Sequence, residues 1–231
     1  MPVSNAASFA YIHVRKTAGT SISRALEAIA PDLTLNEKGL WDILSAHPQR
    51  RWILTTLRSC YPINSITAFP QWHLPAAIVR RIVGARRWND LFTFAFVRNP
   101  WDLVVSAYHF EKRDILEPHM ASSEPDRAEA LRRCFDFERF VRIYPLLEPI
   151  DQTSMLVDEH DKVIVDFVGR FERLNEDFGE ICARLGTPGE PLRHENRTPE
   201  RAHYRSYYTT ESRDIVARYF ARDIGRFNYE Y

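Results

Sequence analysis

The sequence is poor in cysteine, has no long apolar run and carries no excess of charge of either sign. Three cysteines, Cys60, Cys134 and Cys182, lie far apart in the 231 residues and form no CxxC pair. An odd, scattered set of this kind predicts reduced thiols in a cytosol-like compartment and argues against a zinc site. No segment approaches the ~18 apolar residues of a membrane span, and the chain starts without a basic leader. We therefore expect a soluble, cytoplasmic protein without stable membrane insertion.

The charges balance, with 31 Lys and Arg residues against 31 Asp and Glu residues. This balance excludes a general basic field of the kind that attracts nucleic acid, so a bound anion must be held by a local cluster. Hydrophobic residues make up 45% and charged residues 27% of the chain, as in ordinary globular proteins. The length suffices for a sizeable core, and we expect residues 1–231 to form a single domain.

The glycine-rich phosphate loop GxxxxGK[ST] is also missing, although a basic turn follows the first expected strand. The segment 9–14 is short and rich in residues that favour strands. Lys16 follows it and precedes a turn that contains one glycine, Gly19. Apolar residues then recur at helical spacing. Because the first N–H groups of a helix are unpaired and its dipole favours negative charge, this turn can bind an anion. The alternative is an ordinary helix N-cap by Thr20 or Ser21, with Lys16 in solvent.

A second basic turn follows the aromatic, alternating run of residues 92–97, which predicts a strand. Arg98 ends this run, the pair Asn99-Pro100 breaks it, and Ser106 comes eight positions after the arginine within an expected helix. Arginine offers a planar fork suited to bidentate phosphate binding, and a serine two turns further on can face the same ligand. The alternative is a capped helix with a structural arginine salt bridge.

Strands that alternate with helices predict an α/β fold, in which a mostly parallel sheet lies between two layers of helices. Ligands of such sheets bind beyond the carboxyl ends of the strands, where both basic turns are expected, so the two turns form one candidate site. Further expected elements are strands at 52–57 and within 158–171, helices at 128–144, 174–185 and 210–223, and a loop at 116–127.

Together the two turns resemble the cofactor motifs of sulfotransferases that use 3′-phosphoadenosine 5′-phosphosulfate (PAPS). The resemblance is carried by KTAGTS at 16–21, and by VRNPWD at 97–102 followed by Ser106. Later blocks, among them VDFVGRFERLNEDF and YRSYYTTESRDIVARYFARDI, are similar to the same family. The likeness is greatest to the carbohydrate branch, which includes heparan 2-O- and chondroitin sulfotransferases and small bacterial relatives. It implies a P-loop-NTPase-like sulfotransferase fold, PAPS as the donor and 3′,5′-ADP (PAP) as the product.

The resemblance also implies which residues bind the donor. The loop that binds the 5′-phosphosulfate matches the first basic turn, and the pair that grips the 3′-phosphate matches Arg98 and Ser106. The candidate donor-binding residues are therefore Arg15, Lys16, Thr17, Ala18, Gly19, Thr20, Ser21, Arg98 and Ser106.

Two positions depart from the family pattern, and two later segments add to it. Arg15 stands where relatives usually have proline, and Leu103 stands where they usually have arginine. The segment around Phe171–Glu172 matches a region near the donor. Residues Arg193 to Arg201 offer either a further basic contact or a solvated surface.

Sulfuryl transfer to a hydroxyl needs stabilisation of the leaving group and a general base, and it needs no metal. Lys16 is placed to hold the leaving 5′-phosphate. Histidine is the natural base, and the stretch WHLPAAIVRRI resembles the family block that carries it, which makes His73 the first candidate and His47 the second. Alternatively, His73 caps the helix that follows it. His13, within the first strand, is expected to be structural.

The acceptor is expected to be a carbohydrate or glycoconjugate. Trp41, Tyr61 and Trp72 offer either stacking faces for it or ordinary core packing. Arginines 80, 81, 86 and 87 either face an anionic acceptor or lie in solvent. A nucleotide-dependent kinase is a competing interpretation, against which the missing GxxxxGK[ST] speaks. A non-catalytic protein that binds the nucleotide or a sulfated glycan is another, against which the intact Lys16 and Arg98 speak.

Overall fold

The computed structural model describes most of the chain, and its residues group into two compact units. The described residues are 3–4, 7–30, 73–117, 135–147, 150–188, 191–192 and 201–231. Unit 1 takes its residues from Met1–Val97 and Gln152–Asn196, and unit 2 from Arg98–Asp151 and Arg197–Tyr231. The expectation that residues 1–231 form a single domain remains a prediction. None of the helices in the described ranges is long and apolar enough to cross a membrane.

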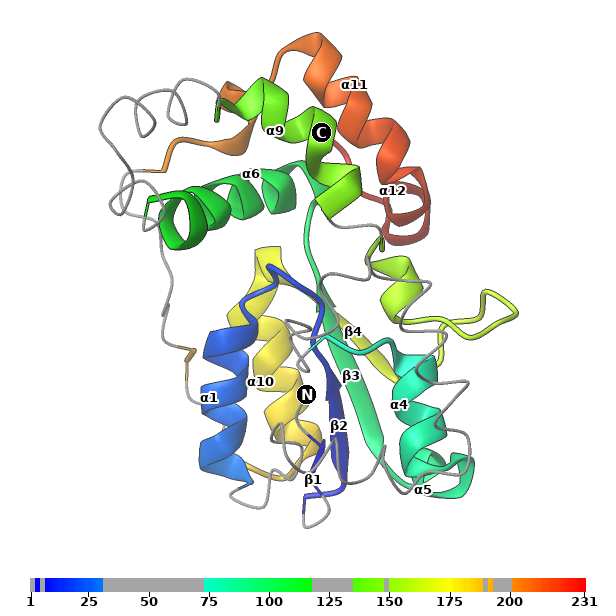
Figure 1. Ribbon diagram of the computed structural model, residues 1–231. Coiled ribbons are helices and arrows are strands. Elements are labelled where there is room, and N and C mark those ends of the chain that lie inside the picture. The colour runs from blue at the N-terminus through cyan, green and yellow to red at the C-terminus, as the bar shows by residue number, and fades with distance from the viewer. Residues whose placement is uncertain are drawn as a thin grey trace. The chain divides into compact units, whose positions relative to one another are not determined.

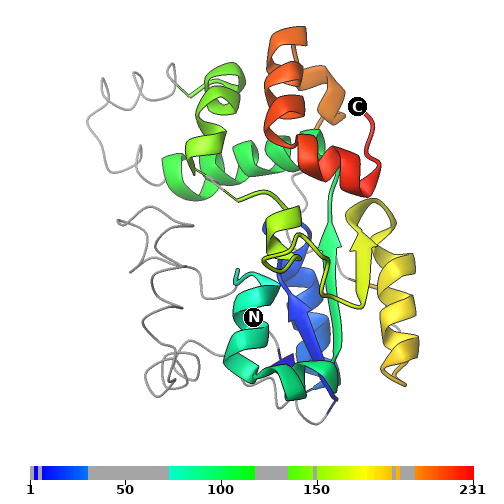
Figure 2. The same cartoon turned by 90° about the vertical axis from the view of Figure 1, so that its right-hand side faces the viewer.

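Within its described part, unit 1 is built around a four-stranded sheet in the order β1-β2-β3-β4. The strands span Val3–Ser4 (β1), Phe9–Ile12 (β2), Phe92–Val97 (β3) and Phe167–Arg170 (β4). β2, β3 and β4 run parallel, and β1 pairs antiparallel with β2. Figure 2 shows the three parallel strands side by side.

Helices cover both faces of this sheet, as the near-continuous apolar sequences of β2 and β3 require of buried parallel strands. Figure 1 shows α1 and α10 on one side of the sheet and α4 and α5 on the other. The helices span Gly19–Ile29 (α1), Ala76–Val83 (α4), Ala85–Asn89 (α5) and Leu174–Arg184 (α10), with 3₁₀ turns at Thr153–Met155 (η3) and Phe171–Arg173 (η4). The layering confirms the predicted α/β class with a mostly parallel sheet.

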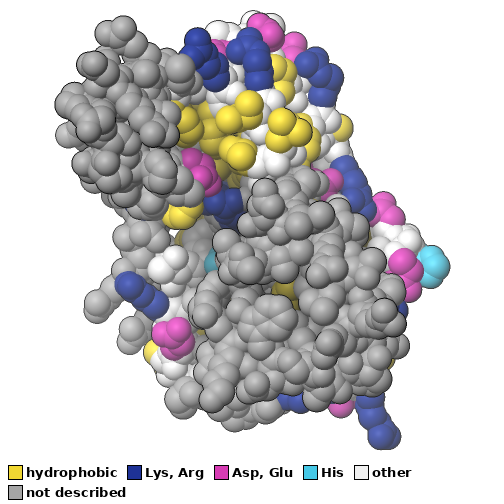
Figure 3. All heavy atoms as spheres, in the orientation of Figure 1, with side chains coloured by type: hydrophobic (Ala, Val, Ile, Leu, Met, Phe, Trp, Pro, Cys, Tyr) yellow, Lys and Arg dark blue, Asp and Glu magenta, His cyan; other side chains and the backbone are white. Residues whose placement is uncertain are grey.

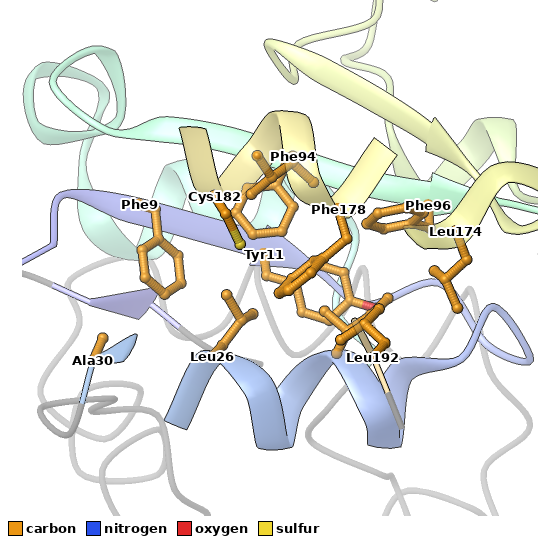
Figure 4. Close-up of a cluster of buried hydrophobic side chains, with 12 residues drawn as sticks. Phe9, Tyr11, Leu26, Ala30, Phe94, Phe96, Leu174, Phe178, Cys182 and Leu192 are labelled. Carbon is orange, nitrogen blue, oxygen red and sulfur yellow. The ribbon is translucent and has the colours of Figure 1, made fainter. Parts of the chain in front are cut away.

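The core of unit 1 lies between the sheet and the pair α1 and α10 (Figure 4). Tyr11 of β2 and Phe94 of β3 are paired in the sheet register and so point to the same side, where their rings stack with centroids 5.4 Å apart. Leu26 of α1 and Phe178 of α10 pack against them, each buried. Burial of side chains of this size stabilises the fold by about 1.5–3 kcal/mol each. Cys182 lies in the same core as a free thiol; the other two cysteines lie outside the described residues.

Unit 2 is helical in its described ranges. Its elements are α6 (Pro100–Phe110), a π-helical segment η2 (Glu111–Leu116), α9 (Phe137–Leu147), a 3₁₀ turn η5 (Tyr204–Tyr207), α11 (Thr210–Tyr219) and α12 (Ala221–Phe227). Aromatic rings form its centre, where Tyr108 packs on Phe137 and Phe140 at centroid distances of 5.4 and 5.5 Å. Figure 3 shows hydrophobic side chains gathered on one face of this unit. In α9, Ile143, Leu146 and Leu147 are exposed.

Several predicted elements are confirmed. The strand at 92–97 has both predicted bounds, the strand within 158–171 is β4, and the helix at 174–185 is α10, which ends before Gly186 with its φ of +67°. The first strand ends at Ile12, two residues earlier than predicted. The strand at 52–57 lies outside the described residues.

Two helix boundaries were predicted wrongly. The helix expected at 128–144 is α9, which begins at Phe137 and ends at Leu147; residues 135–136 are not helical, the Asp136 side chain accepts a hydrogen bond from the Arg139 N–H at 2.8 Å and caps the helix start, and residues 128–134 lie outside the described part. The helix expected at 210–223 is broken at Phe220, whose φ and ψ of −96° and 22° leave the helical range while its ring stays buried. The loop expected at 116–127 begins with two helical residues, and its remainder lies outside the described part.

Candidate functional site

The turn between β2 and α1 is tight and contains two left-handed residues. Lys16 and Ala18 each have a φ of 65°, a conformation that costs a non-glycine residue about 1–2 kcal/mol. Between them, the buried hydroxyl of Thr17 donates to the Val14 carbonyl at 2.8 Å and so serves the turn itself. Strained backbone that the surrounding structure maintains is typical of ligand-binding turns.

The start of α1 has the character of an anion site. Ala18 is the N-cap residue and provides no side-chain hydrogen bond, while Thr20 and Ser21 already lie inside the first turn of the helix. The alternative of an N-cap by Thr20 or Ser21 is therefore not what the structure shows. Because the N-cap residue is an alanine and supplies no capping side chain, the partial positive charge of this helix end can attract an anion. Arg15 and Lys16 precede it, both half-buried.

His73 lies against the same turn, although 60 residues separate it from His13. Its Nδ1 is 3.0 Å from the His13 carbonyl oxygen. Because a carbonyl can only accept, Nδ1 carries the proton and Nε2 carries the basic lone pair. The N-cap of α4 is Pro75, so His73 does not cap that helix. The second candidate base, His47, lies outside the described residues.

Burial lowers the pKa of His73 to about 4; the hydrogen bond to the His13 carbonyl opposes this, and the charges of Arg15 and Lys16 add to it. The imidazole is therefore neutral at neutral pH and able to accept a proton. Unit 1 thus brings together, at the carboxyl end of β2, two cationic side chains, an uncapped helix start and a neutral histidine. These are the parts that transfer of an anionic group to a hydroxyl requires.

In unit 2, the sequence Arg98-Asn99-Pro100 starts α6 for clear local reasons. The Asn99 side chain accepts from the backbone N–H of Trp101 at 3.1 Å, and its own amide donates to the Glu230 carbonyl at 2.8 Å. Pro100 occupies the first helical position, where its missing N–H is not needed. Asn99 and Pro100 thus account for the start of α6. The side chain of Arg98, the residue that follows β3, is not needed for this capping.

Arg98 belongs to a buried charge cluster in unit 2. Its Nε and Nη2 both lie 2.7 Å from Oδ2 of Asp102, and Arg98 is only 5% exposed. The other carboxylate oxygen, Oδ1, pairs with Arg201. Two guanidinium groups therefore share one carboxylate, and these three side chains together carry one more positive than negative charge. The structural salt bridge of the alternative interpretation is present between Arg98 and Asp102. Within this pair the charge of Arg98 is neutralised, and Arg201 adds a second positive charge beside it.

Ser106 is placed on the same face of α6 as this cluster. Asp102, Ser106 and His109 follow at helical spacing and are half-buried, whereas seven other residues of α6 are buried. A polar stripe thus runs along an otherwise buried helix. The role of Asp102 was missed from the sequence although its spacing to Arg98 is that of a helical ion pair. Leu103, the departure from the family pattern, is buried in the core of unit 2.

Replacing Asp102 with asparagine is expected to lower the free energy of unfolding by about 1–3 kcal/mol, because two buried or half-buried arginines lose their shared counter-charge. Urea denaturation measures the change. The matched control is Glu180→Gln in the pair Arg184–Glu180, which has the same four-residue spacing but side chains 46% and 51% exposed; it should lose at most about 0.5 kcal/mol. Equal small losses in both variants would contradict the importance given to the Asp102 cluster.

No group of three or more His, Cys, Asp or Glu side chains in the described ranges is arranged to hold a metal ion. The fold and these two turns define an α/β protein in which a basic turn follows each of two neighbouring parallel strands. Residues 2–230 match the sequence profile of the sulfotransferase family, and the chain therefore belongs to that family. Sulfuryl transfer is the general chemistry that this membership supports.

A relative of this chain occurs in the archaeon Archaeoglobus fulgidus. It is an uncharacterised protein that is 32% identical over 120 residues, which is 51% of this chain and 86% of the relative. Because this relative is uncharacterised, the similarity adds no information on the activity or on the acceptor.

Proposed function

We propose that the protein transfers the sulfuryl group of PAPS to a hydroxyl of a carbohydrate or glycoconjugate, with His73 as general base and without a metal. The observation that carries the proposal is the position of His73: its Nδ1 is hydrogen-bonded at 3.0 Å to the residue that leads into the Lys16 turn. A neutral histidine held at the edge of an anion-binding turn is what sulfuryl transfer to a hydroxyl needs.

The first basic turn is assigned to the 5′-phosphosulfate. Lys16 and Arg15 supply positive charge, and the start of α1 supplies backbone N–H groups from Gly19 to Ser21. Thr17 supports this turn through its hydrogen bond to Val14. The charge on Lys16 matters most as the bond between sulfur and the 5′-phosphate oxygen breaks, because negative charge then grows on that oxygen.

The second turn is assigned to the 3′-phosphate. Arg98 and Ser106 are the expected ligands, and the net positive charge of the Arg98–Asp102–Arg201 cluster supports this role. Arg201 is the last residue of the basic segment 193–201, which the sequence suggested as a further basic contact. We assign it to the 3′-phosphate together with Arg98 and Ser106. A phosphate that approaches this cluster meets a guanidinium already oriented by its carboxylate, which reduces the entropy lost on binding.

In the proposed reaction, the acceptor hydroxyl oxygen forms the new bond to sulfur while its proton passes to Nε2 of His73. The sulfur–oxygen bond to the 5′-phosphate breaks in line, and its electron pair stays on the leaving phosphate beside Lys16. The hydrogen bond from Nδ1 to the His13 carbonyl stabilises the imidazolium that results, because the donor becomes more acidic as the ring gains charge.

The proposal is tested by incubating the purified protein with PAPS labelled in its sulfate, in the presence of EDTA, with a panel of hydroxyl acceptors. The panel contains neutral glycans, acidic glycans and a simple phenol. Transfer to a glycan in the presence of the chelator supports the function. Binding of 3′,5′-ADP without transfer to any acceptor would favour a non-catalytic protein, and transfer only to the phenol would contradict the carbohydrate acceptor.

A further inference from the structure

The imidazole of His13 has three neighbours at the end of β2. Its ring centroid is 5.6 Å from that of Tyr11, with the planes 21° apart, and 4.3 Å from that of His73, with the planes 51° apart. On a third side lies Gly19, the first residue of α1: a Cβ added there would be 1.5 Å from Nε2 of His13. His13 therefore fills the space that any side chain at position 19 would need, and it touches the donor turn and His73 at once.

Packing alone does not explain a histidine in this place. Its Nδ1 is sealed from solvent and has no hydrogen-bond partner within the described part of the chain, which is unfavourable for a polar nitrogen. Burial, with His73 as a second cause, lowers the pKa of His13 well below its usual value, so the ring is neutral. A neutral ring can pack against the turn and the base without changing the charge of the site.

We propose that His13 is a positioning residue, whose ring holds the imidazole of His73 in a fixed place relative to the Lys16 turn. The inference rests on the function proposed above. It assigns a role in catalysis to a side chain that the sequence suggested to be merely structural.

Two separate parts of His13 act on His73. The backbone carbonyl fixes which nitrogen of His73 carries the proton, and the ring limits how the His73 imidazole can tilt about that hydrogen bond. Truncating the side chain leaves the first contact and removes the second. Nε2 then remains basic but no longer points in a fixed direction, and a misplacement of about 1 Å can lower a rate 10²-fold.

His13→Ala is expected to lower kcat about 10- to 100-fold, with a much smaller change in the Kd of 3′,5′-ADP. The pH profile should move as well. Among the described residues, the carbonyl and ring of His13 and the cations Arg15 and Lys16 face His73, and burial is the main cause of its low pKa. Loss of the His13 ring admits water, so the pKa of His73 rises towards its usual value. Because the base must be unprotonated, the acid limb of kcat/KM moves to higher pH.

A double-mutant cycle tests the contact with Gly19. Gly19→Ala alone places its Cβ on the His13 ring and should weaken 3′,5′-ADP binding about tenfold or more. In the His13→Ala background the same methyl group has room, so the double variant should bind 3′,5′-ADP within about threefold of His13→Ala. Thermal unfolding of each variant shows whether it is folded, and His13→Asn replaces His13→Ala if the latter is not.

The outcomes separate the two proposals. A wild-type protein that neither binds 3′,5′-ADP nor transfers sulfate contradicts the proposed function itself. A wild-type enzyme that is active, together with a His13 variant of unchanged kcat and unchanged acid limb, overturns the positioning role alone. Equal effects of Gly19→Ala in the two backgrounds would also overturn it.

Discussion

Replacing His73 with alanine is expected to lower kcat about 10²- to 10⁴-fold, the range that a general base contributes. The Kd of 3′,5′-ADP should change little, because the proposed donor ligands remain. Single-turnover transfer measures the rate, and calorimetry with 3′,5′-ADP measures the binding. His160→Ala is the control, since His160 is exposed in a turn far along the chain, and its kcat should stay within about twofold of wild type.

The pH dependence of the wild-type enzyme gives a second view of His73. Burial lowers the pKa of this histidine to about 4, so the free enzyme keeps its base unprotonated well below neutral pH. The acid limb of kcat/KM should therefore lie near pH 4 to 5 and be absent around the usual pKa of histidine, about 6.5.

A His73→Ala variant with the wild-type rate would show that another group accepts the proton, and His47 would then be the next residue to replace.

Replacing Lys16 with alanine is expected to lower both kcat and the affinity for 3′,5′-ADP. It removes the cation beside the leaving phosphate, and loss of one such stabilising group lowers kcat by about 10²- to 10³-fold. The affinity for 3′,5′-ADP should fall about tenfold, since a charge-assisted contact contributes about 1.5 kcal/mol or more. Lys162→Ala is the matched control, since Lys162 is exposed and lies outside the helices and strands, and it should leave both quantities unchanged. A Lys16→Ala variant with wild-type kcat would remove this residue from the mechanism.

Local signals in the sequence were sufficient for much of the fold. The strand Phe92–Val97 was predicted with both bounds because aromatic residues alternate over its length and Asn99-Pro100 stops it. The break at Phe220 was not predictable from the same kind of signal. The helical spacing of apolar residues continues across it, and the buried position of the Phe220 ring is a tertiary feature that this spacing does not show.

The donor turn shows the same division. Lysine, threonine and one glycine after a strand predicted an anion site, but no local signal showed that the left-handed residues of this turn are Lys16 and Ala18 and not Gly19. Gly19 is needed for a different reason, since His13 occupies the place of its side chain. A contact of this kind depends on how the strand end and the helix start are folded together, and no spacing rule describes it.

Contacts between distant parts of the chain account for the remainder. The pair Arg98 and Asp102 could be predicted from its four-residue spacing, but the pairing of Asp102 with Arg201 joins residues 99 apart. The hydrogen bond between His73 and the His13 carbonyl joins residues 60 apart. Neither follows from composition or periodicity, because both depend on the tertiary fold.

The central claim is that one nucleotide is recognised by both of its phosphates, with Lys16 assigned to the 5′ side and Arg98 and Ser106 to the 3′ side. Calorimetric titration of 3′,5′-ADP, 5′-AMP and Mg-ATP tests it most directly. We expect 3′,5′-ADP to bind about tenfold or more tightly than either of the other two nucleotides, and Ser106→Ala to reduce the ratio of its affinity to that of 5′-AMP. Equal affinity for 3′,5′-ADP and 5′-AMP, a preference for Mg-ATP, or no heat at millimolar 3′,5′-ADP would contradict it.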